Sequence, residues 1–435
     1  MSDLIIKDTK LEGRKLSSTI SVSDELSRYL KHRTLFIEYD ADVHANHSIL
    51  NIPVIATLLP LAWLTGSNIH VQELDQTFLE SMNLLKREFA KMYPLIPFTT
   101  EIKSDKIVHN KINVSDSKKR TGLLFSGGVD STFSLITNSE KNPKLIILWG
   151  VDNFAYPEHF DYWEAVIRTY TKFAEKKNLN FHVIKTNISQ ILDDRRIEHR
   201  FHKELFNGRV RPALQHTLIL LPPVAPLSIG RFNHILMAAS VTPEYDYQAR
   251  PLATRPETDE KIIWADLTVK HDGYILKNRK ILGVISDHLL ENNLILRVCL
   301  KSNLNNGSFN CGRCEKCLRT IVLLVLAGVD PNGCGFLVDE STFTWMRSMW
   351  EKMKSSDALG PWRTLQESIP TQIGTDIHGS KAFFEWYRNF DFKTTEKNWL
   401  KTDLYLSLPY SLAQLLDKVY RKVGINVHND PIVRK

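Results

Sequence analysis

The stretch TGLLFSGGVDSTFSL, residues 121–135, constrains the fold more than any other part of the sequence. A short apolar run comes first, Gly127 and Gly128 follow it, and a helical pattern begins directly afterwards. This order predicts a buried strand, a sharp turn and a helix. The two glycines permit a left-handed backbone and a close approach of a ligand, because neither carries a Cβ atom.

The predicted turn has the features of a phosphate-binding loop. The first N–H groups of a helix lack intrahelical partners and carry partial positive charge, which suits phosphate. Ser126 and Ser131 add hydroxyl donors. Asp130 repels a bare phosphate, so we expect it to act through Mg²⁺ or to cap the helix. The turn contains neither G-x-x-x-x-G-K-[ST] nor G-x-G-x-x-G, the two better-known phosphate-binding patterns.

Apolar segments of strand length alternate with amphipathic ones after residue 120. This alternation predicts an α/β fold with a parallel, doubly wound, Rossmann-like sheet that is covered on both faces. The N-terminal part also combines a strand pattern with an amphipathic helix, for which Asp75 is the expected cap. The expected strands are 34–43, 144–151, 181–187 and 234–240, and the expected helices are 74–93, 159–178 and 343–353.

Four of the five cysteines lie close together in RVCLKSNLNNGSFNCGRCEKCLRT, residues 297–320. Two overlapping C-x-x-C steps bring three thiolates within reach of one ion, and Gly312 eases the turn between the first two. The remaining cysteine of the segment is expected to fold back as the fourth ligand. We predict a closed Zn²⁺ site, with an iron–sulfur cluster as the alternative. The predicted ligands are Cys299, Cys311, Cys314 and Cys317; Cys334 is expected to be an ordinary buried thiol.

The glycine turn resembles the PP-loop, S-G-G-x-D-S, of the N-type ATP pyrophosphatases (adenine nucleotide alpha-hydrolase-like proteins), and all five fixed positions match. Together with the cysteine cluster, it makes residues 120–320 similar to the 7-cyano-7-deazaguanine synthase (QueC) family. The resemblance implies a HUP-type sheet, ATP and Mg²⁺ at the loop, and a zinc held by the four cysteines. The implied nucleotide-binding residues are Ser126, Gly127, Gly128, Val129, Asp130, Ser131, Val151 and Asp152.

The same resemblance implies an ATP-dependent C–N ligase that forms AMP. A carboxylate or amide oxygen would be adenylated with release of pyrophosphate, and a nitrogen donor would then displace AMP. Asp130 and Ser131 are the implied catalytic residues of the loop. Lys280, in KHDGYILKNRKI (270–281), is a further catalytic candidate, because this segment can face phosphates or a carboxylate. The other interpretation of that segment, including His271, Asp272 and Arg279, is a solvated turn and helix. Arg209 and Arg211, near a predicted strand end, are candidates for attracting a polyanion.

The acceptor stays open, because the chain is about twice as long as the family core and the family's nucleobase-holding segment has no clear counterpart at 212–231. Extended QueC-like proteins also occur in bacterial anti-phage gene cassettes, which leaves a protein acceptor as an alternative to a 7-deazaguanine. A partner protein from the same operon is then expected. The competing functions are a tRNA-thiolating PP-loop enzyme and a nucleotide-binding regulatory protein without turnover.

Four regions are expected along the chain: an accessory α/β unit (1–118), the PP-loop domain (119–298), the cysteine cluster with the following helix (299–335) and a helical extension (336–435). Residues 104–120 are polar and are interpreted as a linker. The net charge of +7 is mild, so nucleic-acid binding is not indicated. The N-terminus lacks the layout of a signal peptide, and the apolar stretches 52–64 and 218–227 are short and contain proline. A cytoplasmic protein without membrane contact is expected.

Overall fold

The computed structural model describes residues 3–112, 120–151, 157–206, 208–241, 243, 251–275, 277–292, 294–299, 301, 304, 306–352 and 359–391. By packing, the chain divides into two units. Unit 1 comprises Met1–Ser126 and Thr137–Tyr274, and unit 2 comprises Gly127–Ile136 and Ile275–Lys435. The boundary therefore falls inside the glycine turn, directly after Ser126.

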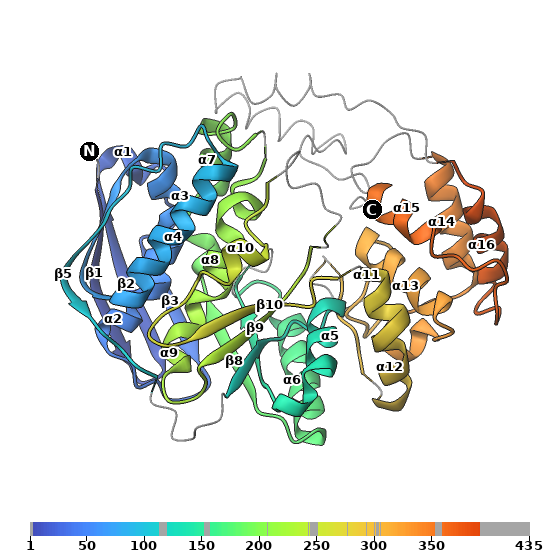
Figure 1. Ribbon diagram of the computed structural model, residues 1–435. Helices are drawn as coiled ribbons and strands as arrows, with labels where there is room; N and C mark the ends of the chain where they lie inside the picture. Colours follow the sequence, from blue (N-terminus) through green and yellow to red (C-terminus); the bar gives the residue numbers. More distant parts are fainter. Residues whose placement is uncertain are drawn as a thin grey trace. The chain divides into compact units, whose positions relative to one another are not determined.

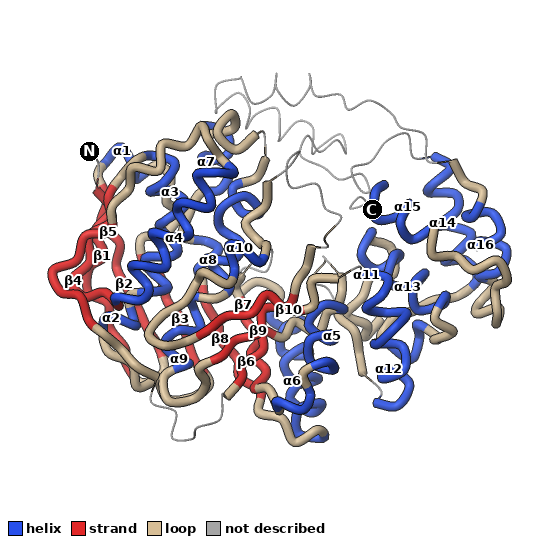
Figure 2. Tube along the Cα trace, in the orientation of Figure 1, coloured by secondary structure: helices blue, strands red, loops and turns tan. Residues whose placement is uncertain are grey.

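Unit 1 is built on a ten-stranded, mostly parallel sheet (Figures 1 and 2), so the α/β prediction is confirmed. The strand order is β10-β9-β6-β7-β8-β3-β2-β1-β4-β5. Only the pairs β8–β3, β3–β2 and β2–β1 are antiparallel. The strands are β1 (Asp3–Glu12), β2 (Lys15–Val22), β3 (Thr34–Tyr39), β4 (Asn68–Asp75), β5 (Ile102–Val108), β6 (Thr121–Leu124), β7 (Lys144–Trp149), β8 (Phe181–Thr186), β9 (His234–Ala238) and β10 (Thr268–Asp272).

The five strands β6 to β10 form a doubly wound half-sheet. Counted along the chain from β6, their spatial order is 3-2-1-4-5, so the direction of winding reverses between β6 and β9. Side chains alternate between two faces of each strand. Leu124, Ile146 and Ile184 face the main core of unit 1, and Trp149 packs instead on Trp163 of α6 (Phe160–Lys176) with ring centroids 5.7 Å apart. Both faces are therefore covered, as expected for parallel strands.

The N-terminal strands continue the same sheet. β3 pairs with β8, so residues of the expected accessory unit and of the expected PP-loop domain share one set of backbone hydrogen bonds. The expected linker at 104–120 is wrong in its first part, because residues up to Val108 belong to β5, an edge strand parallel to β4. Edge strands tolerate charged side chains, which is why this strand reads as a loop. Residues 113–119 lie outside the described part.

The helices of unit 1 bury a wide apolar surface against the sheet. Asp75 caps α4 by accepting a hydrogen bond from the N–H of Phe78 at 2.8 Å, as predicted. The helical run His47–Thr65 is long and apolar enough to cross a membrane, but 94% of it is buried inside the protein, as expected of a core helix. The helices are α1 (Asp24–Ser27), α2 (His47–Leu50), α3 (Ile52–Thr65), α4 (Gln76–Met92), α6, α7 (Asp194–Arg200), α8 (His216–Leu220), α9 (Ala225–Ser228) and α10 (Pro256–Asp259).

Unit 2 is helical in the part that the structure describes. It begins with most of α5 (Val129–Thr137) and continues with α11 (Lys277–Lys280), a π-helical turn (Ile281–Ile285), α12 (Ser286–Asn292) and α13 (Glu315–Leu326). The aromatic-rich segment near the C-terminus forms α14 (Glu340–Lys352), α15 (Leu359–Gln366) and α16 (Ser380–Arg388). Trp350, Trp362 and Tyr387 pack edge to face at the centre of these three helices.

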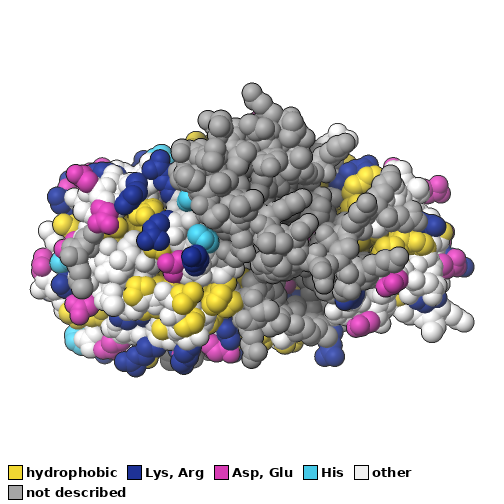
Figure 3. All heavy atoms as spheres, turned by 90° about the horizontal axis from the view of Figure 1, so that it is seen from above, with side chains coloured by type: hydrophobic (Ala, Val, Ile, Leu, Met, Phe, Trp, Pro, Cys, Tyr) yellow, Lys and Arg dark blue, Asp and Glu magenta, His cyan; other side chains and the backbone are white. Residues whose placement is uncertain are grey.

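Basic and acidic side chains are intermixed on the described surface shown in Figure 3. This mixture agrees with the mild net charge and does not form a continuous basic stripe on that face.

Candidate functional site

The glycine turn directly follows β6, at the point where the winding of the parallel strands reverses. The end of the strand is fixed by a hydrogen bond from the N–H of Phe125 to the carbonyl of Ile146, at 2.8 Å. Gly127 has φ +74°, the left-handed conformation that glycine adopts without strain, whereas Gly128 is not left-handed. In sheets of this kind, ligands bind outside the carboxyl ends of the strands at the reversal. The predicted loop therefore occupies the expected position for a binding site.

Ser131 and Asp130 lie in the first turn of α5, which begins at Val129. The hydroxyl of Ser131 donates to the carbonyl of Gly128 at 3.2 Å, and the N–H of Thr132 donates to the same carbonyl at 3.0 Å. These two bonds hold the second glycine against the helix. The N-terminal N–H groups of a helix are oriented along its axis and attract anions.

Lys280 and Asp130 form a buried ion pair within unit 2. The ammonium of Lys280 lies 2.8 Å from Oδ1 of Asp130, and their side chains are 1% and 19% exposed. The ammonium also lies 5.7 Å from the ring centroid of Phe133 on α5. Lys280 ends α11 and precedes the π-helical turn, a form of backbone that is frequent at functional sites.

This ion pair changes the charge of the predicted loop. An aspartate alone would repel phosphate, but Lys280 supplies a positive charge at hydrogen-bonding distance. The loop and its lysine are thus electrically balanced before any ligand binds, and the helix N-terminus is left to attract the anion. The structure brings Lys280 together with Asp130 across 150 residues of sequence.

The four clustered cysteines converge on one point in unit 2. Their sulfur atoms all lie within 4.8 Å of one another, and Sγ of Cys314 is 3.9 Å from that of Cys299 and 3.4 Å from that of Cys317. Four sulfurs around a zinc ion, each bonded at about 2.3 Å, lie about 3.8 Å apart. The arrangement therefore fits one tetrahedral metal ion. Cys334 is buried outside the cluster, where burial raises its pKa to about 11.

Backbone N–H groups next to the cluster favour the negatively charged thiolate, the form of cysteine that binds a metal ion. Gly312 is left-handed, with φ +64°, and the N–H groups of Arg313 and Cys314 point at Sγ of Cys311 at 3.4 and 3.3 Å. Such bonds stabilise thiolate. Hydrogen bonding to Cys299 lowers the pKa of Cys314 to about 7.

Asn310 joins the segment that carries Cys299 to the segment that carries the other three cysteines. It was not identified from the sequence. Its side chain is fully buried, accepts from the N–H of Cys299 at 3.2 Å and donates to the carbonyl of Leu296 at 2.7 Å. The neighbouring Arg297 donates its backbone N–H to the carbonyl of Gly127 at 2.8 Å. The segment that carries Cys299 is therefore hydrogen-bonded to the glycine turn itself.

The remaining predicted residues have mixed outcomes. Val151 is buried directly after β7, where Gly150 accepts a hydrogen bond from Ser189 at 2.7 Å, and Asp152 lies outside the described residues. The guanidinium of Arg211 forms an ion pair with the carboxylate of Asp194, at 2.6 Å. Of two further candidates, Arg279 is exposed, and Asp272 accepts from the side chain of Asn138.

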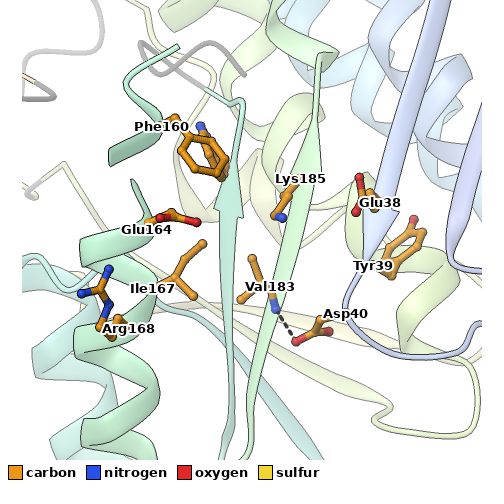
Figure 4. Close-up of a pocket in the computed structure, with 10 residues that line it drawn as sticks. Glu38, Tyr39, Asp40, Phe160, Glu164, Ile167, Arg168, Val183 and Lys185 are labelled. Atoms are coloured by element: carbon orange, nitrogen blue, oxygen red, sulfur yellow. Dashed lines mark hydrogen bonds between the residues drawn. The ribbon is translucent and has the colours of Figure 1, made fainter. Parts of the chain in front are cut away.

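Unit 1 contains a cavity of about 380 Å³ that the sequence did not indicate (Figure 4). It lies between one face of α6 and the ends of β3, β7 and β8. Trp149 and Phe160 supply aromatic surface, and the ammonium of Lys185 lies 5.8 Å from the Trp149 ring centroid. Asp40 is held on the wall by the N–H of Val183 at 2.9 Å. The other lining residues are Glu38, Tyr39, Glu164, Ile167 and Arg168.

Glu198 on α7 makes stability depend on pH. Burial, reinforced by Asp194, raises its pKa from 4.5 to about 7. The folded protein then holds a proton that the unfolded chain releases, so stability falls as pH rises from about 4.5 to 7. Replacing Glu198 with glutamine is expected to remove this loss and to stabilise the protein by about 3 kcal/mol at high pH, with no gain below the unfolded pKa. Urea unfolding at pH 4.5 and above pH 7 measures this change in the free energy of unfolding.

The control for this experiment is Glu175→Gln, on the exposed side of α6. It should leave the pH dependence of the wild type unchanged. Parallel stability curves for wild type and Glu198→Gln would show that Glu198 titrates normally.

Comparison with known proteins leaves the chain without an assigned relative: no protein-family model, no curated protein and no solved structure matches it.

Proposed function

We propose that this protein is an ATP-dependent enzyme of the PP-loop class that adenylates a carboxylate or amide oxygen and then forms a C–N bond. The observation that carries the proposal is the S-G-G-V-D-S turn, which lies at the winding reversal of a 3-2-1-4-5 half-sheet and has Lys280 paired with its aspartate. This strand order also supports a HUP-type fold.

The chemistry assigns a role to each part of the loop. The acceptor oxygen attacks the α-phosphorus of ATP, and pyrophosphate leaves with its bonding electrons. Charge grows on the departing pyrophosphate, and the N-terminal N–H groups of α5, the serine hydroxyls and the Lys280 ammonium would stabilise it. Asp130 orients the Lys280 ammonium and, with ATP bound, would help to hold Mg²⁺. The amine or ammonia then attacks the acyl adenylate, and AMP leaves.

The four cysteines have a structural role in this proposal. Cys299, Cys311, Cys314 and Cys317 would bind Zn²⁺ and, through the Arg297–Gly127 hydrogen bond, would hold the glycine turn in place. A thiolating enzyme needs a cysteine that carries the transferred sulfur and is not already bound to a structural metal ion. The convergence of all four sulfurs favours a structural metal over that alternative.

The test is release of AMP and pyrophosphate from ATP, in the presence of 7-carboxy-7-deazaguanine and ammonium or of candidate acceptor proteins from neighbouring genes. Acceptor-dependent formation of both products in equal amounts is the expected result. Release of ADP and phosphate, or no acceptor-dependent release with any of these acceptors, would refute the proposal.

A further inference from the structure

The cavity of unit 1 has no role in the proposed function (Figure 4). Its volume of about 380 Å³ is in the range of small-molecule sites, which combine apolar walls with a few placed polar groups. Trp149 and Phe160, whose ring centroids are 5.6 Å apart, supply aromatic surface, and Ile167 and Val183 supply aliphatic surface. All of the lining residues belong to unit 1, so the cavity lies within one packing unit.

The wall formed by α6 carries an acid and a base that do not pair with each other. Glu164 and Arg168 are one helical turn apart, with the acid nearer the N-terminus, which is the favourable order for an ion pair. Both line the cavity, yet neither makes an ion pair or a hydrogen bond within the part of the chain that the structure describes. This wall therefore presents one negative and one positive charge side by side and is neutral in sum.

The wall formed by β3 and β8 also holds opposite charges that do not pair. Glu38 of β3 is level with Lys185 of β8, a position at which opposite charges attract across a sheet. The ammonium of Lys185 lies instead 5.8 Å from the ring centroid of Trp149, and Glu38 has no ion pair among the described residues. Asp40 adds a second acid to the lining, 3.2 Å from His182. With this histidine neutral, the wall carries one more negative charge than positive charges.

The two walls complement different ligand groups. Opposite charges on neighbouring side chains of α6 match the carboxylate and the ammonium that an α-amino acid carries on one carbon atom. The sheet wall, with its excess acid, matches a further positive charge. In Figure 4 the two walls lie on opposite sides of the cavity, with Ile167 and Val183 between them. A ligand that spans the cavity therefore needs a zwitterionic end, an aliphatic middle and a cationic end.

We propose that this cavity binds a free α-amino acid with a cationic side chain, such as arginine or lysine. The guanidinium of Arg168 holds its carboxylate, in the paired geometry that these two groups favour, and Glu164 holds its ammonium. The side-chain methylenes cover Ile167 and Val183, and the side-chain cation pairs with Glu38. The inference does not rest on the proposed function.

The test is calorimetric titration of the full chain with L-arginine, L-citrulline and agmatine. Citrulline replaces the guanidinium of arginine with a neutral group of nearly the same shape, and agmatine lacks the carboxylate. Arginine is expected to bind about tenfold more tightly than either analogue, because each analogue leaves one charged group of the cavity without its partner.

Two variants assign the two ends of the ligand. Glu38→Gln should weaken arginine binding about tenfold and remove its advantage over citrulline, because the site then no longer recognises the side-chain charge. Arg168→Gln should weaken arginine binding to a similar extent and remove its advantage over agmatine. The control is Lys172→Gln, an exposed position one turn further along α6, which should bind all three compounds as the wild type does. All three side chains reach solvent, so thermal stability should stay unchanged.

The other outcomes each contradict a part of the proposal. Wild-type protein that binds neither arginine nor lysine at millimolar concentration overturns it. Agmatine binding as tight as that of arginine identifies a simple amine site and overturns the amino-acid assignment. Citrulline binding as tight as that of arginine overturns the cationic side chain. If neither Glu38→Gln nor Arg168→Gln weakens arginine binding, the ligand binds elsewhere and the cavity is not its site.

Discussion

Replacing Asp130 with asparagine is expected to lower AMP and pyrophosphate release by about 10²- to 10³-fold, the usual effect of removing one electrostatic contact to a transition state. The asparagine oxygen can still accept the hydrogen bond from Lys280, so the loop keeps its shape. What changes is the charge: Lys280 loses its counter-ion, and the orientation of its ammonium toward the phosphates is no longer fixed. A rate assay with ATP and the acceptor, alongside a thermal melt, measures both effects.

The alanine variant is a less precise test of the same residue. Asp130→Ala removes the carboxylate that pairs with the buried ammonium of Lys280, and breaking a buried ion pair typically costs about 3–5 kcal/mol. Loss of activity would then mix with loss of structure. Lys280→Met in combination with Asp130→Asn removes both charges, so it should recover stability without recovering turnover.

Asp161→Asn is the matched control, because Asp161 is an exposed acid in the first turn of another helix, α6. It should retain full activity. If Asp130→Asn turns over at the wild-type rate, the glycine turn is a structural helix cap and the proposed site is wrong.

The parts of the fold that follow from sequence are those with a strong local pattern. The apolar run before Gly127 predicts β6, and Asp75 followed by a helical repeat predicts α4; both predictions are confirmed. β10 was missed because one face of the strand carries the polar residues Thr268, Lys270 and Asp272, a pattern that resembles a solvated turn. A charged edge strand gains its hydrogen bonds from a neighbour that is distant in sequence, so its local pattern is weak.

In the candidate site, too, features that depend on neighbouring residues were predicted, and contacts between residues far apart in the sequence were not. The spacing of the cysteines predicts their convergence, because a C-x-x-C step fixes the distance between thiols. The partner of Asp130 could not be chosen from sequence, because several cations in residues 270–281 fit equally well and only the packing of α11 selects Lys280. Asn310 carries no recognisable pattern, because a buried amide that joins two backbone segments depends entirely on where those segments meet.

Loss of the cysteine cluster is expected to have the largest effect on stability. Structural zinc contributes about 10–16 kcal/mol of apparent binding free energy in small zinc domains, much of which is folding free energy. Cys317 is fully buried at the start of α13, so Cys317→Ser or a strong chelator should abolish the cooperative unfolding transition of unit 2. ATP binding should weaken at the same time, because the Arg297–Gly127 hydrogen bond depends on the segment that carries Cys299. Calorimetry and a nucleotide-binding titration measure the two effects.

The fifth cysteine provides the control for this prediction. Cys334→Ser changes a buried thiol outside the cluster, so it should lose at most a modest amount of stability and should keep one metal ion per chain in native mass spectrometry. Asn310→Ala keeps all four sulfurs but removes the amide that joins them, so we expect metal affinity between those of wild type and Cys317→Ser. A visible absorbance band would identify an iron–sulfur cluster in place of zinc. If Cys317→Ser kept its metal and its unfolding transition, the sulfurs would not form a structural site.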